Sequence, residues 1–192
     1  MANKEQINGY FAGRTGDQGT AQPSLLPTKA RDGAPPGNKW LMHFTEGEVE
    51  VRRTKDDDYP YISYRAEVDE PEDFAGRGVY GMFFFPRPLA DDAEDGDVEK
   101  YDRNTDRVIG QLDAVLGEGT CANLEPDNLE AALDELVSLL ENASFVGKIG
   151  KERGKKVDPD DEGKDAERYP DRNRISYFEP GDTWTPPDDS AA

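Results

Sequence analysis

The residues of this chain that are best suited to chemistry are clustered basic side chains. Residues 146–156, "VGKIGKERGKK", carry five cations and one acid, although the whole chain has 23 basic and 42 acidic residues and a net charge of −19. Lysine and arginine bind phosphate through charge and charge-assisted hydrogen bonds. Because the cluster is framed by glycines, it predicts a hairpin that contacts phosphates. Its cations are Lys148, Lys151, Arg153, Lys155 and Lys156.

Further cations and three tyrosines stand near the same expected turns. A single nucleic-acid strand is held by a basic groove along its phosphates and by aromatic faces that stack its bases, at about 1–3 kcal/mol per base. These residue types therefore predict a single-strand site between two hairpins. The alternative, that the hairpin cations only protect sheet edges and maintain solubility, stays open. The additional residues are Arg52, Arg53, Lys55, Arg172 and Arg174 for phosphates, and Tyr59, Tyr61 and Tyr177 for bases.

Groups for catalysis or metal binding are sparse. The single cysteine, Cys121, and the single histidine, His43, allow neither a zinc cluster nor a disulfide nor a nucleophile with a histidine base. Residues 158–163, "DPDDEG", match the first half of a calcium loop, but Tyr169 occupies the place of the bidentate glutamate. We therefore expect no enzyme, no metal and no cofactor.

The acidic residues are distributed unevenly. Residues 91–146 hold sixteen acidic and three basic side chains, and residues 179–192 hold four acidic and no basic ones. Such runs are usually solvated, but a strongly negative surface can also engage basic partners. A second hypothesis is therefore an acidic interaction module, such as a DNA mimic or a virion-associated protein.

Composition limits the class of protein and its compartment. A chain that is 34% hydrophobic and 34% charged can bury one modest core. It has no apolar run of about 18 residues and no apolar leader at its N-terminus, so we expect no membrane partner. With one cysteine, a reducing, cytoplasmic location fits best.

Periodicity predicts three strands, two helices and two further strands. Apolar and polar residues alternate in "EVEVRRT", "YISYRAEV" and "VYGMFFF", whereas "NTDRVIGQLDAVLG" and "DNLEAALDELVSLLEN" carry apolar stripes at helical spacing. The closing strands are "SFVGKIGKERGKKV" and "RNRISYF". This order predicts a mainly β fold, an OB-like five-stranded antiparallel barrel with two helices between strands 3 and 4. An open sheet packed against two helices is the alternative.

Three apolar features are expected to serve the core. In "FFF", residues 83–85, alternation requires Phe83 and Phe85, or Phe84, to be buried. Trp40 and Trp184 fall outside the expected strands and are interpreted as lids over the core. The leucine stripe of the second helix fits a core face better than a dimer seam, although a homo-oligomer stays possible. The stripe consists of Leu129, Leu133, Leu136 and Leu140.

The chain is expected to have three parts. Residues 1–38, rich in Gly, Pro, Gln and Thr, predict a flexible arm. Residues 39–180 form the OB-like domain, with an acidic and helical insertion at 87–142. Residues 181–192 form an acidic C-terminal tail, similar to the tails through which bacterial single-strand binders recruit replication or recombination proteins.

Several of these segments resemble one family. "PYISYRAEV", "FAGRGVYGMFFF", "RVIGQLDAVLG", "NLEAALDELVSLLENASFVGKIGKE" and "DRNRISYFEP" occur in an order similar to that of the phage single-stranded-DNA-binding, OB-fold proteins long catalogued as a domain of unknown function. The resemblance covers roughly residues 40 to 180. It implies an OB fold and single-stranded DNA binding in phage replication or recombination. The matching elements are Pro60–Val68, Gly76–Phe85, Val108–Gly117, Phe145–Lys151 and Arg172–Phe178.

Overall fold

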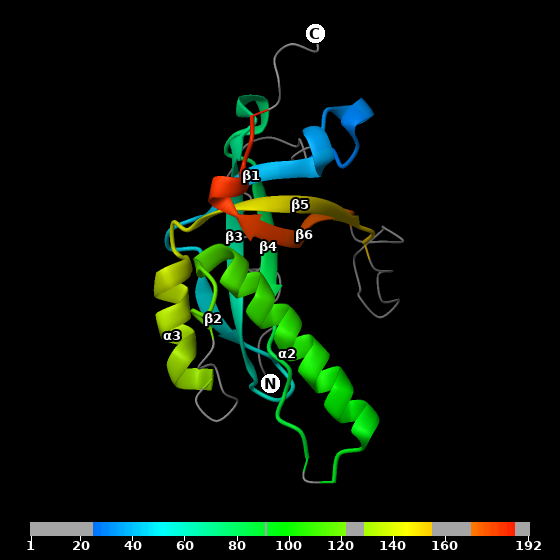
Figure 1. Ribbon diagram of the computed structural model, residues 1–192, viewed down its shortest axis with the longest axis vertical. Helices are drawn as coiled ribbons and strands as arrows, with labels where there is room; N and C mark the ends of the chain where they lie inside the picture. The colour runs from blue at the N-terminus through cyan, green and yellow to red at the C-terminus, as the bar shows by residue number, and fades with distance from the viewer. Residues whose placement is uncertain (1–24, 91, 122–128, 155–169, 187–192) are drawn as a thin grey trace, which may run out of the picture.

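Antiparallel strands and two helices build the structure, a computed structural model that describes residues 25–90, 92–121, 129–154 and 170–186 (Figure 1). In this part of the chain, six strands share one sheet. The strands are β1 (Lys39–Phe44), β2 (Glu50–Arg53), β3 (Pro60–Glu70), β4 (Gly78–Phe83), β5 (Ser144–Glu152) and β6 (Arg172–Pro180). The helices are α2 (Asp95–Leu116) and α3 (Leu129–Leu140), and the short 3₁₀ turns include η1 (Ala30–Asp32), η2 (Pro36–Asn38), η3 (Glu72–Phe74) and η5 (Gly181–Thr183).

Strand β3 is the centre of the sheet. One edge of β3 pairs with β2 near its start and with β1 near its end, and the other edge pairs with β4. Between β1 and β2 the Thr45 amide donates to the Arg65 carbonyl at 3.0 Å, and the Arg65 amide donates to the Glu48 carbonyl at 3.2 Å. β1 and β2 therefore act as one strand interrupted by a turn.

The sheet continues from β1 through β5 to β6 and remains open. β5 and β6 cross in front of β3 and β4 in Figure 1, and α2 lies below them. β6 comes close to β4, but no backbone ladder joins these two strands in the described part of the chain. The mainly β fold with two helices after β4 is confirmed, whereas the described strands do not show a closed barrel.

An aromatic core fills the space between the two strand groups. Phe44 lies 4.6 Å from Phe145 between ring centroids, and Phe83 lies 5.5 Å from Phe178, so the core joins the β4 side to the β6 side. Both helices add apolar residues to this core, α2 through Val108 and Leu112. On β3 the alternation in "YISYRAEV" is confirmed, because every second residue is buried, namely Ile62, Tyr64, Ala66 and Val68. From α3 the core receives Leu133, Leu136 and Leu140, which confirms the core interpretation of these three leucines.

Two expectations about element positions were wrong. Trp40 is not a lid outside the strands, because it lies within β1, is fully buried and packs edge-on against Phe74 at 5.2 Å. The first helix is longer than the predicted segment "NTDRVIGQLDAVLG", because α2 begins at Asp95 and not near Asn104. Asp95 and Asp97 lie in the first turn of α2, where the helix dipole favours acidic side chains, so they support this helix start.

The expected flexible arm also needs correction over residues 25–38. Leu26 is buried, and its amide and carbonyl bond to the side-chain amide of Asn173 in β6, at 2.6 and 3.2 Å. Asn38 donates to the Ile149 carbonyl at 2.6 Å and accepts a bond from the Trp40 indole at 2.8 Å. These bonds fix residues 25–38 against β5 and β6, and residues 1–24 lie outside the described part of the chain.

Close packing of β3 against β4 depends on a glycine. Tyr64 stands opposite Gly81 in the register, and a Cβ at Gly81 would lie only 2.3 Å from the Tyr64 hydroxyl. Tyr64 is enclosed by aromatic rings, and burial raises the pKa of its hydroxyl well above the ordinary tyrosine value. The ring therefore has little room to move away from a larger residue.

We predict that Gly81→Ala lowers the free energy of unfolding by about 1–3 kcal/mol, because it overpacks the core at Tyr64. Urea denaturation followed by tryptophan fluorescence measures this. Gly110→Ala is the matched control: Gly110 is an exposed residue of α2 with nothing within 4 Å of the added Cβ. It should stabilise the protein by up to about 1 kcal/mol. Equal effects of both variants would contradict the packing argument.

Candidate nucleic-acid interface

Exposed apolar and aromatic side chains line up on the outer face of β3 and β4. In β4, Val79 and Phe83 face the core, so Tyr80 and Met82 face outward. Tyr80 is 49% exposed, Met82 53% and, just beyond the strand, Phe84 37%. We call Tyr61, Tyr80, Met82 and Phe84 the outer row. Isolated exposed apolar residues are ordinary, but several on one face of a sheet make that face a candidate binding surface.

Aromatic contacts join one end of the outer row to the β2–β3 turn. The Tyr61 and Phe84 rings stack at a centroid distance of 5.7 Å and an interplanar angle of 27°. Tyr59 packs against the same Phe84 ring at 6.0 Å. Phe84 thus packs against two tyrosines and is still 37% exposed, so it is a candidate surface for stacking a base.

Three guanidinium groups border this aromatic surface. Arg52 on β2 pairs with Tyr61 in the register. Arg65 lies opposite Tyr80, with its guanidinium carbon 5.9 Å from the ring centroid. Arg87, which follows β4, lies over the Tyr59 ring, with its guanidinium carbon 5.4 Å from the ring centroid. Arginine stacks on aromatic faces and bonds phosphate in a bidentate way, so it suits a site that holds both parts of a nucleotide.

Hydrogen bonds give the β2–β3 turn a fixed shape. The Tyr59 amide donates to the Thr54 hydroxyl at 2.9 Å, and the Thr54 amide donates to the Tyr59 carbonyl at 2.9 Å. The Tyr59 hydroxyl donates to the Pro86 carbonyl at 2.9 Å, which ties the turn to the exit of β4. Burial, followed by the neighbouring Tyr101, raises the pKa of the Tyr59 hydroxyl. Tyr59 is therefore more a support for Phe84 than a free stacking residue.

Asp57 holds both Thr54 and Arg87 at this turn. The Thr54 hydroxyl donates to its carboxylate, and Arg87 forms an ion pair with it. These contacts, the Thr54 hydrogen bond first, lower the pKa of the Asp57 carboxyl below the ordinary aspartate value. The ion pair also fixes Arg87 above Tyr59, at the border of the outer row.

The second hairpin forms a separate group. Lys148 pairs with Tyr177 between β5 and β6, and its ammonium lies 5.3 Å from the exposed tyrosine ring. This hairpin also contains salt bridges. Lys151 Nζ is 3.0 Å from Asp171 Oδ2, and Arg172 Nη2 is 3.1 Å from Glu152 Oε2. The exposed residues Arg153 and Arg174 also lie here, whereas Lys155, Lys156 and the calcium-like residues 158–163 fall outside the described part of the chain.

The structure brings together part of the predicted site. Tyr59, Tyr61, Arg52 and Arg53 lie at the β2–β3 turn, with Lys55 exposed at its tip. Tyr177 contacts Lys148 on another pair of strands, so it does not extend the Tyr61–Phe84 stack. Sequence reasoning missed Tyr80, Met82, Arg65 and Arg87. The signal was present for the first two, because strict alternation in "VYGMFFF" places every second residue outside.

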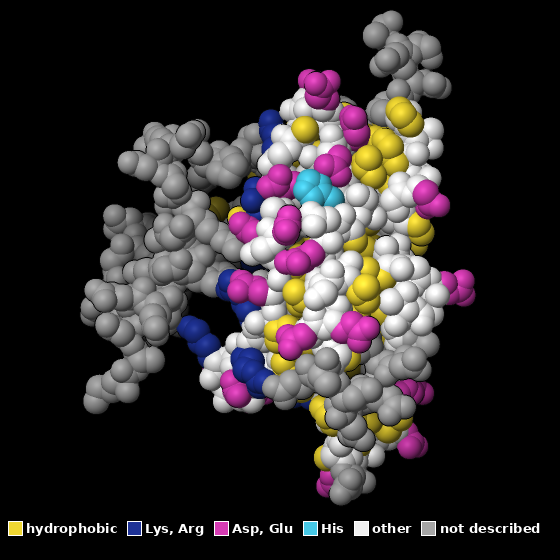
Figure 2. Space-filling model, turned by 90° about the vertical axis from the view of Figure 1, so that its left-hand side faces the viewer, with side chains coloured by type: hydrophobic (Ala, Val, Ile, Leu, Met, Phe, Trp, Pro, Cys, Tyr) yellow, Lys and Arg dark blue, Asp and Glu magenta, His cyan; other side chains and the backbone are white. Residues whose placement is uncertain are grey.

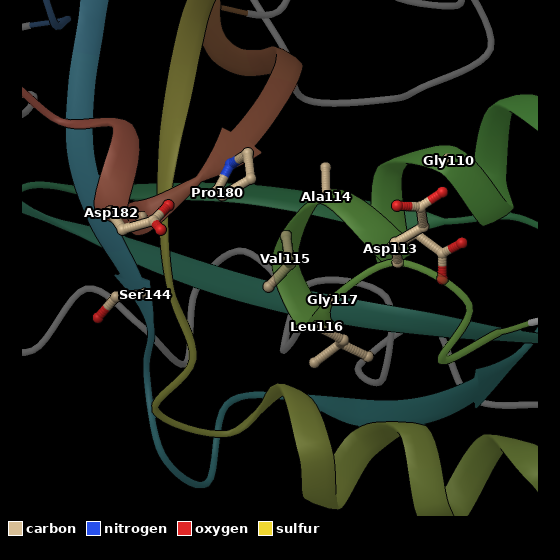
Figure 3. Close-up of a pocket in the computed structure, with 11 residues that line it drawn as sticks. Gly110, Asp113, Ala114, Val115, Leu116, Gly117, Ser144, Pro180 and Asp182 are labelled. Atoms are coloured by element: carbon tan, nitrogen blue, oxygen red, sulfur yellow. The ribbon is translucent and has the colours of Figure 1, made fainter.

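One other face of the molecule suits a phosphate chain poorly. Figure 2 shows a face over which acidic side chains are scattered, with Lys and Arg side chains along one margin. The single histidine of the chain also lies beside an acid, because His43 Nδ1 is 2.7 Å from Asp69 Oδ1. A shallow groove lies between the end of α2 and η5, where Ala114 and Val115 approach Pro180 and Asp182 (Figure 3). Its lining includes three acids and no cation, so it does not fit a nucleic acid.

Comparisons with protein-family models, curated proteins and solved structures each find no significant match for this chain. Within the described ranges, no three His, Cys, Asp or Glu side chains are grouped to hold a metal ion. No helix there is long and apolar enough to cross a membrane. Function must therefore be argued from the geometry of the outer row and its arginines.

We predict that Thr54→Val raises the pKa of the Asp57 carboxyl toward the ordinary aspartate value, because it removes the strongest hydrogen bond to the ionised form. A pKa held low in the folded state means that the turn keeps its Asp57 contacts until the pH falls through that lowered value. NMR titration of the side-chain carboxyl carbon measures the change. Ser138→Ala removes a hydroxyl on α3 instead and should leave Asp57 unaffected. An unchanged titration in Thr54→Val would refute this origin of the shift.

Proposed function

We propose that this chain is a non-enzymatic single-stranded-DNA-binding protein of a phage replication or recombination system, acting in the cytoplasm of the host cell. The observation that carries the proposal is the outer row, in which Phe84 stacks on Tyr61 and remains 37% exposed. Single-strand binders use aromatic faces because every base has a face to stack, whatever its sequence. Arg52, Arg65 and Arg87 border the row at the places where a strand's phosphates would pass.

The strand arrangement supports an OB-like interpretation. If β1 and β2 count as one interrupted strand, five strands remain, and the two outermost, β4 and β6, lie close together. An OB barrel binds oligonucleotides on the face of its strands 2 and 3 and with the loops that follow strands 1 and 4. In this chain that face is the outer side of β3 and β4. The first loop is the fixed turn of residues 54–59, and the other follows β5.

An acidic interaction module remains the competing proposal. Its support is the exposed first half of α2, where residues 95–100 are all exposed and include three acids. It would leave the outer row without a role. The two proposals therefore differ in which surface contacts the partner, and variants of the outer row separate them.

We predict that Tyr61→Ala and Phe84→Ala each weaken binding to oligo-dT by roughly 10- to 100-fold, equivalent to the loss of one stacked base at about 1–3 kcal/mol. Fluorescence anisotropy with a labelled oligonucleotide at low salt measures this. Leu139→Ala is the control, since Leu139 is an apolar residue of α3 with 46% exposure. Unchanged binding in all three variants, or no binding by the unmodified protein, would refute the proposed function.

The second hairpin has its own test. Changing Lys151, Arg153, Lys155 and Lys156 together to Glu should abolish binding at moderate salt, because four phosphate contacts become repulsive. The same anisotropy assay applies, and circular dichroism checks that the fold is kept. If affinity and its salt dependence stay the same, this hairpin does not contact the DNA.

A further inference from the structure

Each arginine that borders the outer row is bound to a carboxylate on the same surface. Arg52 Nε donates to Glu50 Oε1 at 2.7 Å. Arg65 Nη2 lies 2.6 Å from Glu67 Oε1, and Arg65 Nη1 lies 3.8 Å from Glu48 Oε1. Arg87 is paired with Asp57 in the neighbouring turn. The side chains of Arg52 and Arg65 are 26% and 24% exposed, so these pairs lie at the accessible surface rather than in the core.

We propose that Glu50, Glu67 and Asp57 are specificity-determining residues of this face. They neutralise its arginines, so that exposed bases and not phosphate charge select the ligand. This inference rests on the proposed single-strand function and deepens it. The expected ligand is a single strand with unstacked bases, and the excluded ligand is a duplex, which offers the face mainly its phosphates.

Ion exchange explains why the pairing matters. When a free cation neutralises a phosphate of a single strand, a condensed counterion is released, and the logarithm of affinity falls by about 0.7 per tenfold rise in salt. When the cation is already paired, the phosphate must displace a carboxylate. That carboxylate is left beside the phosphate and takes up a counterion itself. The net release from each paired arginine is therefore close to zero.

Stacking is not reduced by these carboxylates. Base–aromatic contact depends on accessible aromatic side chains, and Tyr80 and Phe84 are 49% and 37% exposed. In a duplex the bases are stacked on one another, so the same face would gain only phosphate contacts that its own acids oppose. The row with its paired arginines thus favours single strands by making the phosphate contribution small.

Register links the first pair directly to the stacking residues. Glu50 pairs with Ser63 and Arg52 with Tyr61 across β2 and β3, so the Glu50 carboxylate holds the arginine that adjoins the Tyr61–Phe84 stack. Arg65 has the same relation to Tyr80, with Glu67 two residues further along β3. Both acids are surface residues whose change to glutamine preserves shape, so neither variant should threaten the fold.

The test measures oligo-dT affinity between about 50 mM and about 200 mM salt for Glu50→Gln, Glu67→Gln and the double variant. We expect tighter binding at low salt and a steeper salt slope, by up to about 0.7 for each single variant and up to about 1.4 for the double variant. The increase should be smaller for Glu67→Gln than for Glu50→Gln, because Arg65 keeps its longer ion pair with Glu48. The double variant should also bind a duplex of equal length that the unmodified protein does not hold. Asp182→Asn makes the same one-unit change in net charge at the groove of Figure 3 and should leave the slope unchanged.

The outcomes separate this inference from the function on which it rests. If the unmodified protein binds oligo-dT through Tyr61 and Phe84, but Glu50→Gln and Glu67→Gln behave like Asp182→Asn, the specificity role is overturned and the function stands. If the unmodified protein binds the duplex as tightly as the single strand, the specificity role is overturned as well. If it binds no oligo-dT at low salt, both the function and the inference fail.

Discussion

The alternation of side chains along β3 and β4 is the constraint on which the rest of the structure depends. Because successive residues point to opposite faces, each residue given to the core places its neighbours outside. Tyr64 and Phe83 face inward and bring the β3–β4 pair onto the aromatic core, with Gly81 making room for the Tyr64 ring. The same alternation leaves Tyr61 and Phe84 stacked on the outside, where a ligand can reach them.

The same surface carries arginines, although the chain as a whole is strongly acidic. A net charge of −19 argues against a nucleic-acid partner if only the sum is considered. The arginines around the outer row are nevertheless in place, each held by an acid such as Glu50 or Asp57. Exposed ion pairs of this kind contribute only about 0–1 kcal/mol to stability, so they can open when a ligand arrives. Acidity and single-strand binding are therefore compatible on this face.

Local sequence patterns predicted most of the strands and helices. Contacts between residues that are far apart in the sequence could not be predicted. Alternation in "YISYRAEV" identified the buried side of β3, and the spacing of Leu133, Leu136 and Leu140 identified the core side of α3. β1 was missed as a strand because the apolar Leu41 interrupts the alternation of Trp40, Met42 and Phe44 with polar residues, and because β1 follows a Gly/Pro-rich segment. The docking of Leu26 on Asn173 could not be predicted, because it joins residues 147 positions apart. The ion pairs of Arg65 and Arg87 likewise depend on register and turn geometry, which a single sequence does not specify.

The central claim is that the outer face of β3 and β4 is where a single strand lies. The most direct measurement is NMR of the labelled protein during titration with oligo-dT, following the backbone amides and the Met82 methyl group. The account predicts shifts on Tyr61, Tyr80, Met82 and Phe84, on the turn of residues 54–59 and on the basic residues of the second hairpin, with little change in α3 or in the groove beside η5. Shifts confined to the acidic half of α2, or no shifts at all, would contradict it.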